Sequence, residues 1–155
     1  MTWGWMRFSV VVVALLTVSA AAAEPCTAEA GQKAVTGAAE LVARLGVAAA
    51  RPVLATPEGG GFCGPYAVTV IDYDGTWRID PVNEVNVGRS VRALTDGAAV
   101  NFVTGMIGAA RRGGGRLGSY FTTDNEHGKP VHKALFYIDV PSRRVVVYGG
   151  FIVEP

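Results

Sequence analysis

The chain has 155 residues, which allows one domain, and its 14 basic and 13 acidic side chains give a formal net charge of +1. No basic stripe or acidic block stands out, which argues against nucleic acid as a partner. After the first 23 residues no apolar stretch is long enough to span a bilayer, which argues against a transmembrane helix in the remainder.

The first 23 residues have the three-part layout of a secretory signal peptide. Arg7 is their only charge, an apolar run follows over residues 8–16, and Ala21-x-Ala23 is a small-residue cleavage site. We therefore expect residues 1–23 to be cleaved on export, to the periplasm or outside the cell. Residues 24–155 would then form one ligand-binding domain. The alternative is an uncleaved N-terminal anchor.

Two cysteines, Cys26 and Cys63, remain in the exported chain. An even, small number of cysteines in an oxidising compartment predicts one disulfide, with two buried thiols as the alternative. The bridge would tie the start of the first helix to the loop before the hairpin. In the chain-entropy model it would stabilise the fold by about 3–4 kcal/mol.

Two helices are predicted. Residues 27–50 carry apolar side chains at helical spacing, Thr27 can cap the start, and Arg51-Pro52 should end this helix. A second helix is expected over residues 98–112, followed by a run of three glycines that can provide a left-handed exit. Between the first helix and the hairpin, residues 52–65 are rich in proline and glycine and predict a loop.

Residues 66–81 predict a β-hairpin. Two strand-like runs flank Asp74-Gly75, and we expect a type I′ turn there. The same segment contains Asp72-x-Asp74, which also matches the nucleophile motif of haloacid-dehalogenase-type phosphatases. Such enzymes place the motif before a helix in a parallel sheet, and they need a later acidic pair that this chain lacks. The hairpin is therefore the favoured interpretation.

The remainder predicts three strands, over residues 116–122, 130–140 and 143–153, joined by short polar turns. Short connections of this kind indicate an antiparallel meander. The predicted fold class is α+β: a five-stranded antiparallel sheet with a long N-terminal helix and a second helix. We expect both helices on one side of the sheet.

Several segments in this part of the chain resemble one known family in their order and spacing. They are the hairpin ending in Asp80-Pro81, Asn86-Val87-Gly88-Arg89-Ser90, Thr95-Asp96-Gly97 with its helix and glycine run, Gly118-Ser119-Tyr120, Pro130-Val131-His132-Lys133, and Tyr148-Gly149-Gly150-Phe151-Ile152. Together they resemble a single Cache domain, the PAS-like extracytoplasmic sensor module of bacteria.

The resemblance implies a small-molecule-binding domain, and known ligands of similar modules include small carboxylates. Two departures fall at pocket positions. The family often has His-Pro where this chain has Asp80-Pro81, and its usual Tyr is here Phe136. Most relatives join the module to a membrane helix and a signalling domain. This chain stops at Pro155, so the resemblance implies a free-standing form, with a membrane-bound signalling protein as a possible partner.

Polar and aromatic groups within the apolar strands are the candidate ligand-binding residues, because a pocket needs apolar walls and a few placed donors. Lys133 in particular can offer an ammonium to a carboxylate. For each candidate the alternative is a core or surface role. The candidates are Tyr66, Trp77, Arg78, Asp80, Tyr120, Lys133 and Phe136.

The predicted function is non-catalytic binding of a small ligand, an organic acid, in a sensing role. No cofactor and no metal are implied. One alternative is a magnesium-dependent phosphatase that uses Asp72 and Asp74. The other is a ligand-free interaction module for a membrane signalling partner.

Overall fold

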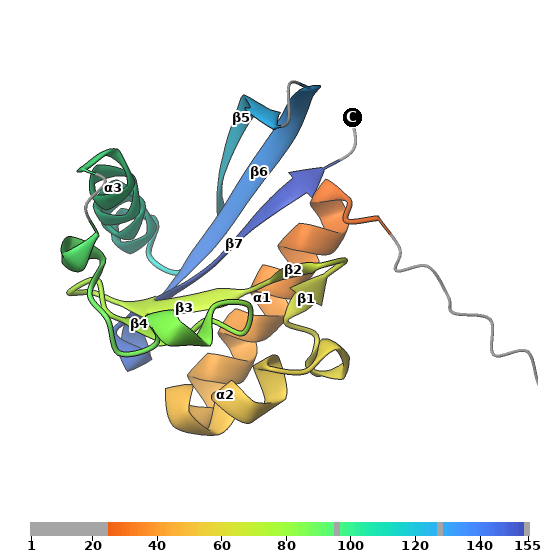
Figure 1. The fold of residues 1–155 in the computed structure, drawn as a ribbon. Coiled ribbons are helices and arrows are strands. Elements are labelled where there is room, and N and C mark those ends of the chain that lie inside the picture. The colour runs from red at the N-terminus through yellow and green to blue at the C-terminus, as the bar shows by residue number, and fades with distance from the viewer. Residues whose placement is uncertain (1–24, 95–96, 127–128, 154–155) are drawn as a thin grey trace, which may run out of the picture.

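A five-stranded antiparallel sheet is the centre of the fold (Figure 1). The computed structural model describes residues 25–94, 97–126 and 129–153, so the predicted signal peptide lies outside it. The strands lie in the order β4-β3-β7-β6-β5, and the predicted α+β class is confirmed. Their bounds are β3 Thr69–Asp72, β4 Trp77–Ile79, β5 Gly118–Glu126, β6 Lys129–Val140 and β7 Val145–Val153.

The predicted N-terminal helix forms as two helices, α1 (Ala28–Leu45) and α2 (Val47–Leu54). The Thr27 side chain caps α1 by accepting a hydrogen bond from the Ala30 N–H at 3.1 Å. Gly46 ends α1 with a φ of 82°, which only glycine adopts readily. The predicted end at Arg51-Pro52 is therefore wrong, because Gly46 breaks the helix earlier and α2 continues past Pro52.

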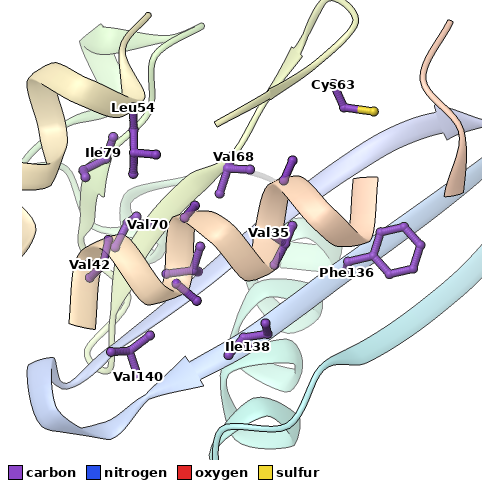
Figure 2. Close-up of a cluster of buried hydrophobic side chains, with 14 of the residues drawn as sticks. Val35, Val42, Leu54, Cys63, Val68, Val70, Ile79, Phe136, Ile138 and Val140 are labelled. Carbon is purple, nitrogen blue, oxygen red and sulfur yellow. The ribbon is translucent and has the colours of Figure 1, made fainter. Parts of the chain in front are cut away.

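Helix α1 packs along one face of the sheet through small and branched apolar residues (Figure 2). Val35 and Val42 are fully buried there against side chains of β3, β6 and β7. A Cβ at Gly31 would meet the Phe151 ring at 2.7 Å, so glycine at this position allows the close approach of helix and sheet. This interface forms the larger of two cores.

The second core lies on the opposite face, beneath α3 (Gly97–Gly113), as Figure 1 shows. Met106, Ile107 and Ala110 of α3 are buried there with Ile71 and Val146 of the sheet. The expectation that both helices lie on one side is therefore wrong. The sheet is apolar on both faces, and each face is covered by its own helix.

The β3–β4 hairpin turns at Tyr73-Asp74, not at the predicted Asp74-Gly75. The Gly75 N–H donates to the Asp72 carbonyl at 3.0 Å, and the Asp72 N–H donates to the Thr76 carbonyl at 3.0 Å. Only Gly75 of this turn has positive φ, at 90°. The type I′ turn is therefore wrong. The pattern is a three-residue loop that ends in a left-handed glycine.

A β-bulge interrupts the hairpin at Arg78. Val70 pairs with Ile79 and Ile71 pairs with Trp77, so Arg78 is one extra residue in β4. In a regular strand Trp77 and Ile79 would share a face. With the bulge, Trp77 joins the core beneath α3 while Ile79 joins the core beneath α1.

A small two-stranded sheet, β1 (Phe62–Cys63) with β2 (Tyr66–Ala67), lies beside the start of α1. Cys26 and Cys63 form a disulfide, which confirms that prediction. The bridge joins the residue before the Thr27 cap to the strand that pairs with Tyr66. It therefore fixes the position of β2 relative to α1.

Residues 80–94 return along the free edge of β4. The Trp77 N–H donates to the Arg89 carbonyl, and the Gly88 N–H donates to the Trp77 carbonyl. Two 3-10 turns, Glu84–Asn86 and Val91–Ala93, complete the loop. It covers the sheet edge and forms a wall over the face that also carries α3.

Candidate functional site

The bulge at Arg78 determines which side chains of β4 reach the candidate site. Trp77 and Asp80 are three residues apart and would face opposite sides of a regular strand. The extra residue places both on the face that carries α3, and both line the same hollow. Together with the neighbouring residues of β7 they form one end of the site.

The first hollow, called here the Lys133 hollow, has a volume of about 350 Å³. Its outer wall is formed by Phe102 of α3 and Tyr120 of β5, whose rings meet edge to face with centroids 6.3 Å apart. Lys133 is the only charged residue among the described residues that line it. They are Tyr66, Phe102, Tyr120, Lys133, Ala134, Leu135, Gly150, Phe151 and Ile152.

The second hollow, called here the Asp80 hollow, has a volume of about 300 Å³. The loop after β4 forms one wall and the face of β7 forms the floor. Asp80 is the only charged residue among the described residues that line it. They are Pro65, Tyr66, Ala67, Thr69, Trp77, Asp80, Val82, Asn83, Asn86, Tyr148 and Gly150.

The two hollows meet at Tyr66 and Gly150, which line both. We call the combined space the groove. Tyr66 is placed by β2 and by an edge-to-face contact with Phe151, with ring centroids 6.3 Å apart. Gly150 has no side chain, so the floor is open at the point where the hollows join. The two volumes lie in the range typical of small-molecule sites.

The floor of the Asp80 hollow contains a hydrogen-bonded pair of aromatic residues. Trp77 Nε1 donates to Tyr148 Oη at 3.0 Å. Burial raises the pKa of Tyr148 to about 12, and the nearby Asp80 carboxylate contributes to the increase. The phenol therefore stays neutral at physiological pH and keeps a proton that it can donate.

The Asp80 carboxylate is itself held in place by the loop that follows it. Oδ1 accepts a hydrogen bond from the Asn83 N–H at 3.0 Å, and Oδ2 accepts one from Asn86 Nδ2 at 2.9 Å. The residue is only 8% exposed. Its orientation is therefore fixed before any ligand arrives.

Five of the seven predicted binding residues line the groove: Tyr66, Trp77, Asp80, Tyr120 and Lys133. The other two lie elsewhere. Arg78 is exposed, pairs with Asp72 at 3.5 Å and lines two hollows outside the groove. Phe136 is fully buried against α1, as Figure 2 shows, and its ring lies on the opposite face from the groove.

Sequence reasoning did not single out Phe102, Tyr148 or Gly150 as binding residues. Tyr148 and Gly150 belong to a strand segment that the resemblance had already marked, and they share a face with Ile152. That alternation could have identified them once the exposed face was known. Phe102 belongs to the predicted second helix, and its side chain is 48% exposed at the rim of the groove.

The Asp72-x-Asp74 motif lies in a hairpin of an antiparallel sheet, away from the groove. The Thr76 N–H donates to Asp72 Oδ1 at 2.9 Å and to Asp74 Oδ1 at 3.1 Å. Burial raises the pKa of Asp72, and hydrogen bonding with Asp72 and Thr76 lowers the pKa of Asp74. Both carboxylates therefore act locally, as acceptors for the backbone of the turn.

Within residues 25–94, 97–126 and 129–153, no group of three or more His, Cys, Asp or Glu side chains could hold a metal ion. In the same ranges, no helix has the length and apolar character needed to cross a membrane.

No protein-family model and no curated protein matches this sequence. Among solved structures, a periplasmic sensor domain of a chemotaxis protein matches with a TM-score of 0.55 and 20% identity, over 81% of this chain and 90% of that one. A Cache chemosensory domain, from a study of carboxylic acid recognition, matches with a TM-score of 0.54 and 15% identity, over 81% and 88%.

A methyl-accepting chemotaxis protein from Vibrio parahaemolyticus RIMD 2210633 also matches, with a TM-score of 0.50 and 16% identity over 69% of this chain and 70% of that one. These likenesses show that the chain has the fold of a single Cache-like sensor domain, as the resemblance implied. The Cys26–Cys63 disulfide supports an extracytoplasmic location, because disulfides persist in oxidising compartments.

Proposed function

We propose that the groove binds a small organic acid and that the protein is an exported, non-catalytic sensor domain. The observation that carries this proposal is the Lys133 hollow. It is lined mainly by apolar and aromatic groups, and Lys133 is the one charged residue among its described lining residues. A cation at the edge of an apolar hollow is suited to an anion with an apolar body.

The carboxylate of the ligand would lie against the Lys133 ammonium, where a charge-assisted hydrogen bond is stronger than a neutral one. The hydroxyls of Tyr66 and Tyr120 are further donors at the same hollow. The apolar body would cover Leu135, Gly150 and Ile152. Carboxylic acid recognition by a Cache domain of the same fold supports this ligand class.

In this proposal residues 1–23 direct export and are removed, and residues 24–155 form the ligand-binding domain. The protein meets its ligand outside the cytoplasm and presents the bound form to a membrane-bound signalling protein. The groove needs no reactive group for this role, since occupancy of the binding site is the signal.

A thermal-shift screen against short and medium-chain carboxylates tests the proposal, because a ligand that binds only the folded state raises the free energy of unfolding. The gain is about 2.7 kcal/mol at a ligand concentration 100 times Kd. At least one carboxylate should raise Tm, and Lys133→Met should abolish the shift while keeping the length of the side chain.

The matched control is Lys33→Met. Lys33 is exposed on α1, on the other face of the sheet, so its loss should leave the shift unchanged. If no carboxylate raises Tm, or if Lys133→Met and Lys33→Met respond alike, the groove does not bind acids through Lys133.

A further inference from the structure

The Asp80 hollow holds a buried carboxylate that forms no ion pair with a described residue. Asp80 is 8% exposed, and no Lys or Arg in the part of the chain that the structure describes forms an ion pair with it. Its hydrogen-bond partners among the described residues, the Asn83 N–H and the Asn86 amide, are neutral donors. A buried carboxylate of this kind is stabilised further by a cation that hydrogen-bonds to it.

The carboxylate still has room for such a partner. An ionised carboxylate offers about four acceptor positions, and the loop occupies one on each oxygen. The same hollow is lined by the rings of Tyr66, Trp77 and Tyr148. Aromatic faces attract cations, so the rings and the carboxylate favour the same type of group.

We propose that the ligand carries a protonated amine at the end remote from its carboxylate. The amine lies against Asp80 and the carboxylate against Lys133, with an apolar chain between them over Gly150. The ligand class is therefore an ω-amino acid or a molecule with the same two charged ends. This inference rests on the proposed function and specifies the ligand class for the same groove.

The register of the sheet sets the length of this ligand. Lys133 pairs with Ile152 and Thr69 pairs with Tyr148, so the two ends lie about 13 Å apart along β7. Asp80 follows β4, three strand spacings from β6, which adds about 14 Å across the sheet. After the reach of both side chains, the charges of the ligand are on the order of 10 Å apart.

Calorimetric titration of the full chain with octanoate, octanedioate, 8-aminooctanoate and 4-aminobutanoate tests the inference. The three eight-carbon compounds share one length and differ only in the remote end. We expect 8-aminooctanoate to bind about tenfold or more tightly than octanoate, because it adds a charge-assisted hydrogen bond. Octanedioate should bind more weakly than octanoate, and 4-aminobutanoate is too short to reach both charges.

Asp80→Asn should remove the preference for the amine, since the amide offers no charge to the amine. Asp74→Asn, at an exposed carboxylate of the hairpin outside the groove, is the matched control and should keep the preference. The comparison of ligands on the unmodified chain needs no variant, so the test does not depend on the folding of Asp80→Asn.

Equal affinity of the unmodified chain for octanoate and 8-aminooctanoate would overturn this inference and leave the proposed function standing. A preference that survives in Asp80→Asn would also overturn it. If neither octanoate nor 8-aminooctanoate binds while another carboxylate raises Tm, this inference fails and the proposed function stands.

Discussion

The bulge at Arg78 decides the composition of the groove. It brings the side chains of Trp77 and Asp80 to one face of the sheet. In a regular strand, two residues three positions apart would face opposite sides. Arg78 itself points away from the groove and pairs with Asp72. Its contribution to the site is therefore geometric, through the extra residue that it adds to β4.

Gly150 gives the most direct test at the scale of one residue. A Cβ there would meet only Leu135 Cδ1, at 3.8 Å, which is ordinary contact. Gly150→Val should therefore leave the free energy of unfolding within about 0.5 kcal/mol while its side chain obstructs the floor of the groove. We expect loss of ligand binding with an unchanged urea denaturation curve.

The neighbouring glycine is the matched control. A Cβ at Gly149 would overlap the buried ring of Phe151, so Gly149→Val should destabilise the fold by about 1–3 kcal/mol. If Gly150→Val binds ligand as well as the unmodified chain does, the ligand does not lie over this part of β7.

Two tyrosines should make the free energy of unfolding depend on pH in the alkaline range. Burial, and for Tyr73 also a 2.7 Å hydrogen bond to Asp139, raises the pKa of Tyr73 and of Tyr148 to about 12, from 10.0. The folded state therefore holds protons that the unfolded state releases. Stability should be complete below pH 10 and decrease as the pH rises towards 12.

Urea denaturation at several pH values above 9 measures this decrease. Tyr148→Phe should make the slope shallower, because it removes one of the two late-titrating groups. A free energy of unfolding that stays constant, or rises, between pH 10 and 12 would contradict this assignment.

At the scale of elements, the disulfide ties the start of α1 to the strand pair that carries Tyr66. The bridge spans 37 residues, so the chain-entropy model assigns it about 4 kcal/mol. The double variant Cys26→Ser with Cys63→Ser should lose about that much free energy of unfolding, measured by urea denaturation. It should also bind ligand more weakly, because Tyr66 loses its anchor.

The binding part of this prediction needs a separate control. A variant equally destabilised in the α1 core, such as Val42→Ala, leaves Tyr66 in place and should keep the affinity of the unmodified chain at temperatures where it is folded. If both variants bind equally well, the disulfide stabilises the fold without positioning Tyr66.

The sequence was a better guide to which segments form helices and strands than to which face of the sheet each helix covers. Helical spacing, the Thr27 cap and the strand runs identified helices and strands, and the two cysteines identified the bridge. The side of the sheet that α3 covers was not predictable from β3, because Val70 and Ile71 are equally apolar and suit a helix on either face. Residues 27–50 contain three glycines, Gly31, Gly37 and Gly46, and only Gly46 has a positive φ.

The same limit explains which of the seven candidate residues line the groove. Five of the seven lie in the groove because polar and aromatic residues in apolar strands are few and tend to mark a cavity. Phe136 was a poor choice because its neighbour Tyr137 faces the other side, and pairing of β6 with β7 decides which of the two meets α1. Arg78 also lies outside the groove. A β-bulge leaves no clear pattern in a single sequence, so the face that Arg78 occupies was not predictable.

At the scale of the whole molecule, the sheet is buried on both faces but not to the same extent. Helices α1 and α2 cover one face in a continuous core, whereas α3 covers only part of the other. The groove occupies the remainder of that second face, between α3, the loop after β4 and the β1–β2 pair. A ligand there would contact α3, the loop after β4 and the β1–β2 pair. Its binding can therefore alter how these three segments pack together.

The central claim is that a small acid binds in this groove, and Trp77 reports on it directly. Trp77 lines the Asp80 hollow, and the other two tryptophans, Trp3 and Trp5, lie in the predicted signal peptide. With Trp3→Phe and Trp5→Phe, fluorescence arises from Trp77 alone. Titration with 8-aminooctanoate should change this emission saturably, and Gly150→Val should abolish the change. Calorimetric binding of the same ligand with unchanged Trp77 emission would contradict the account.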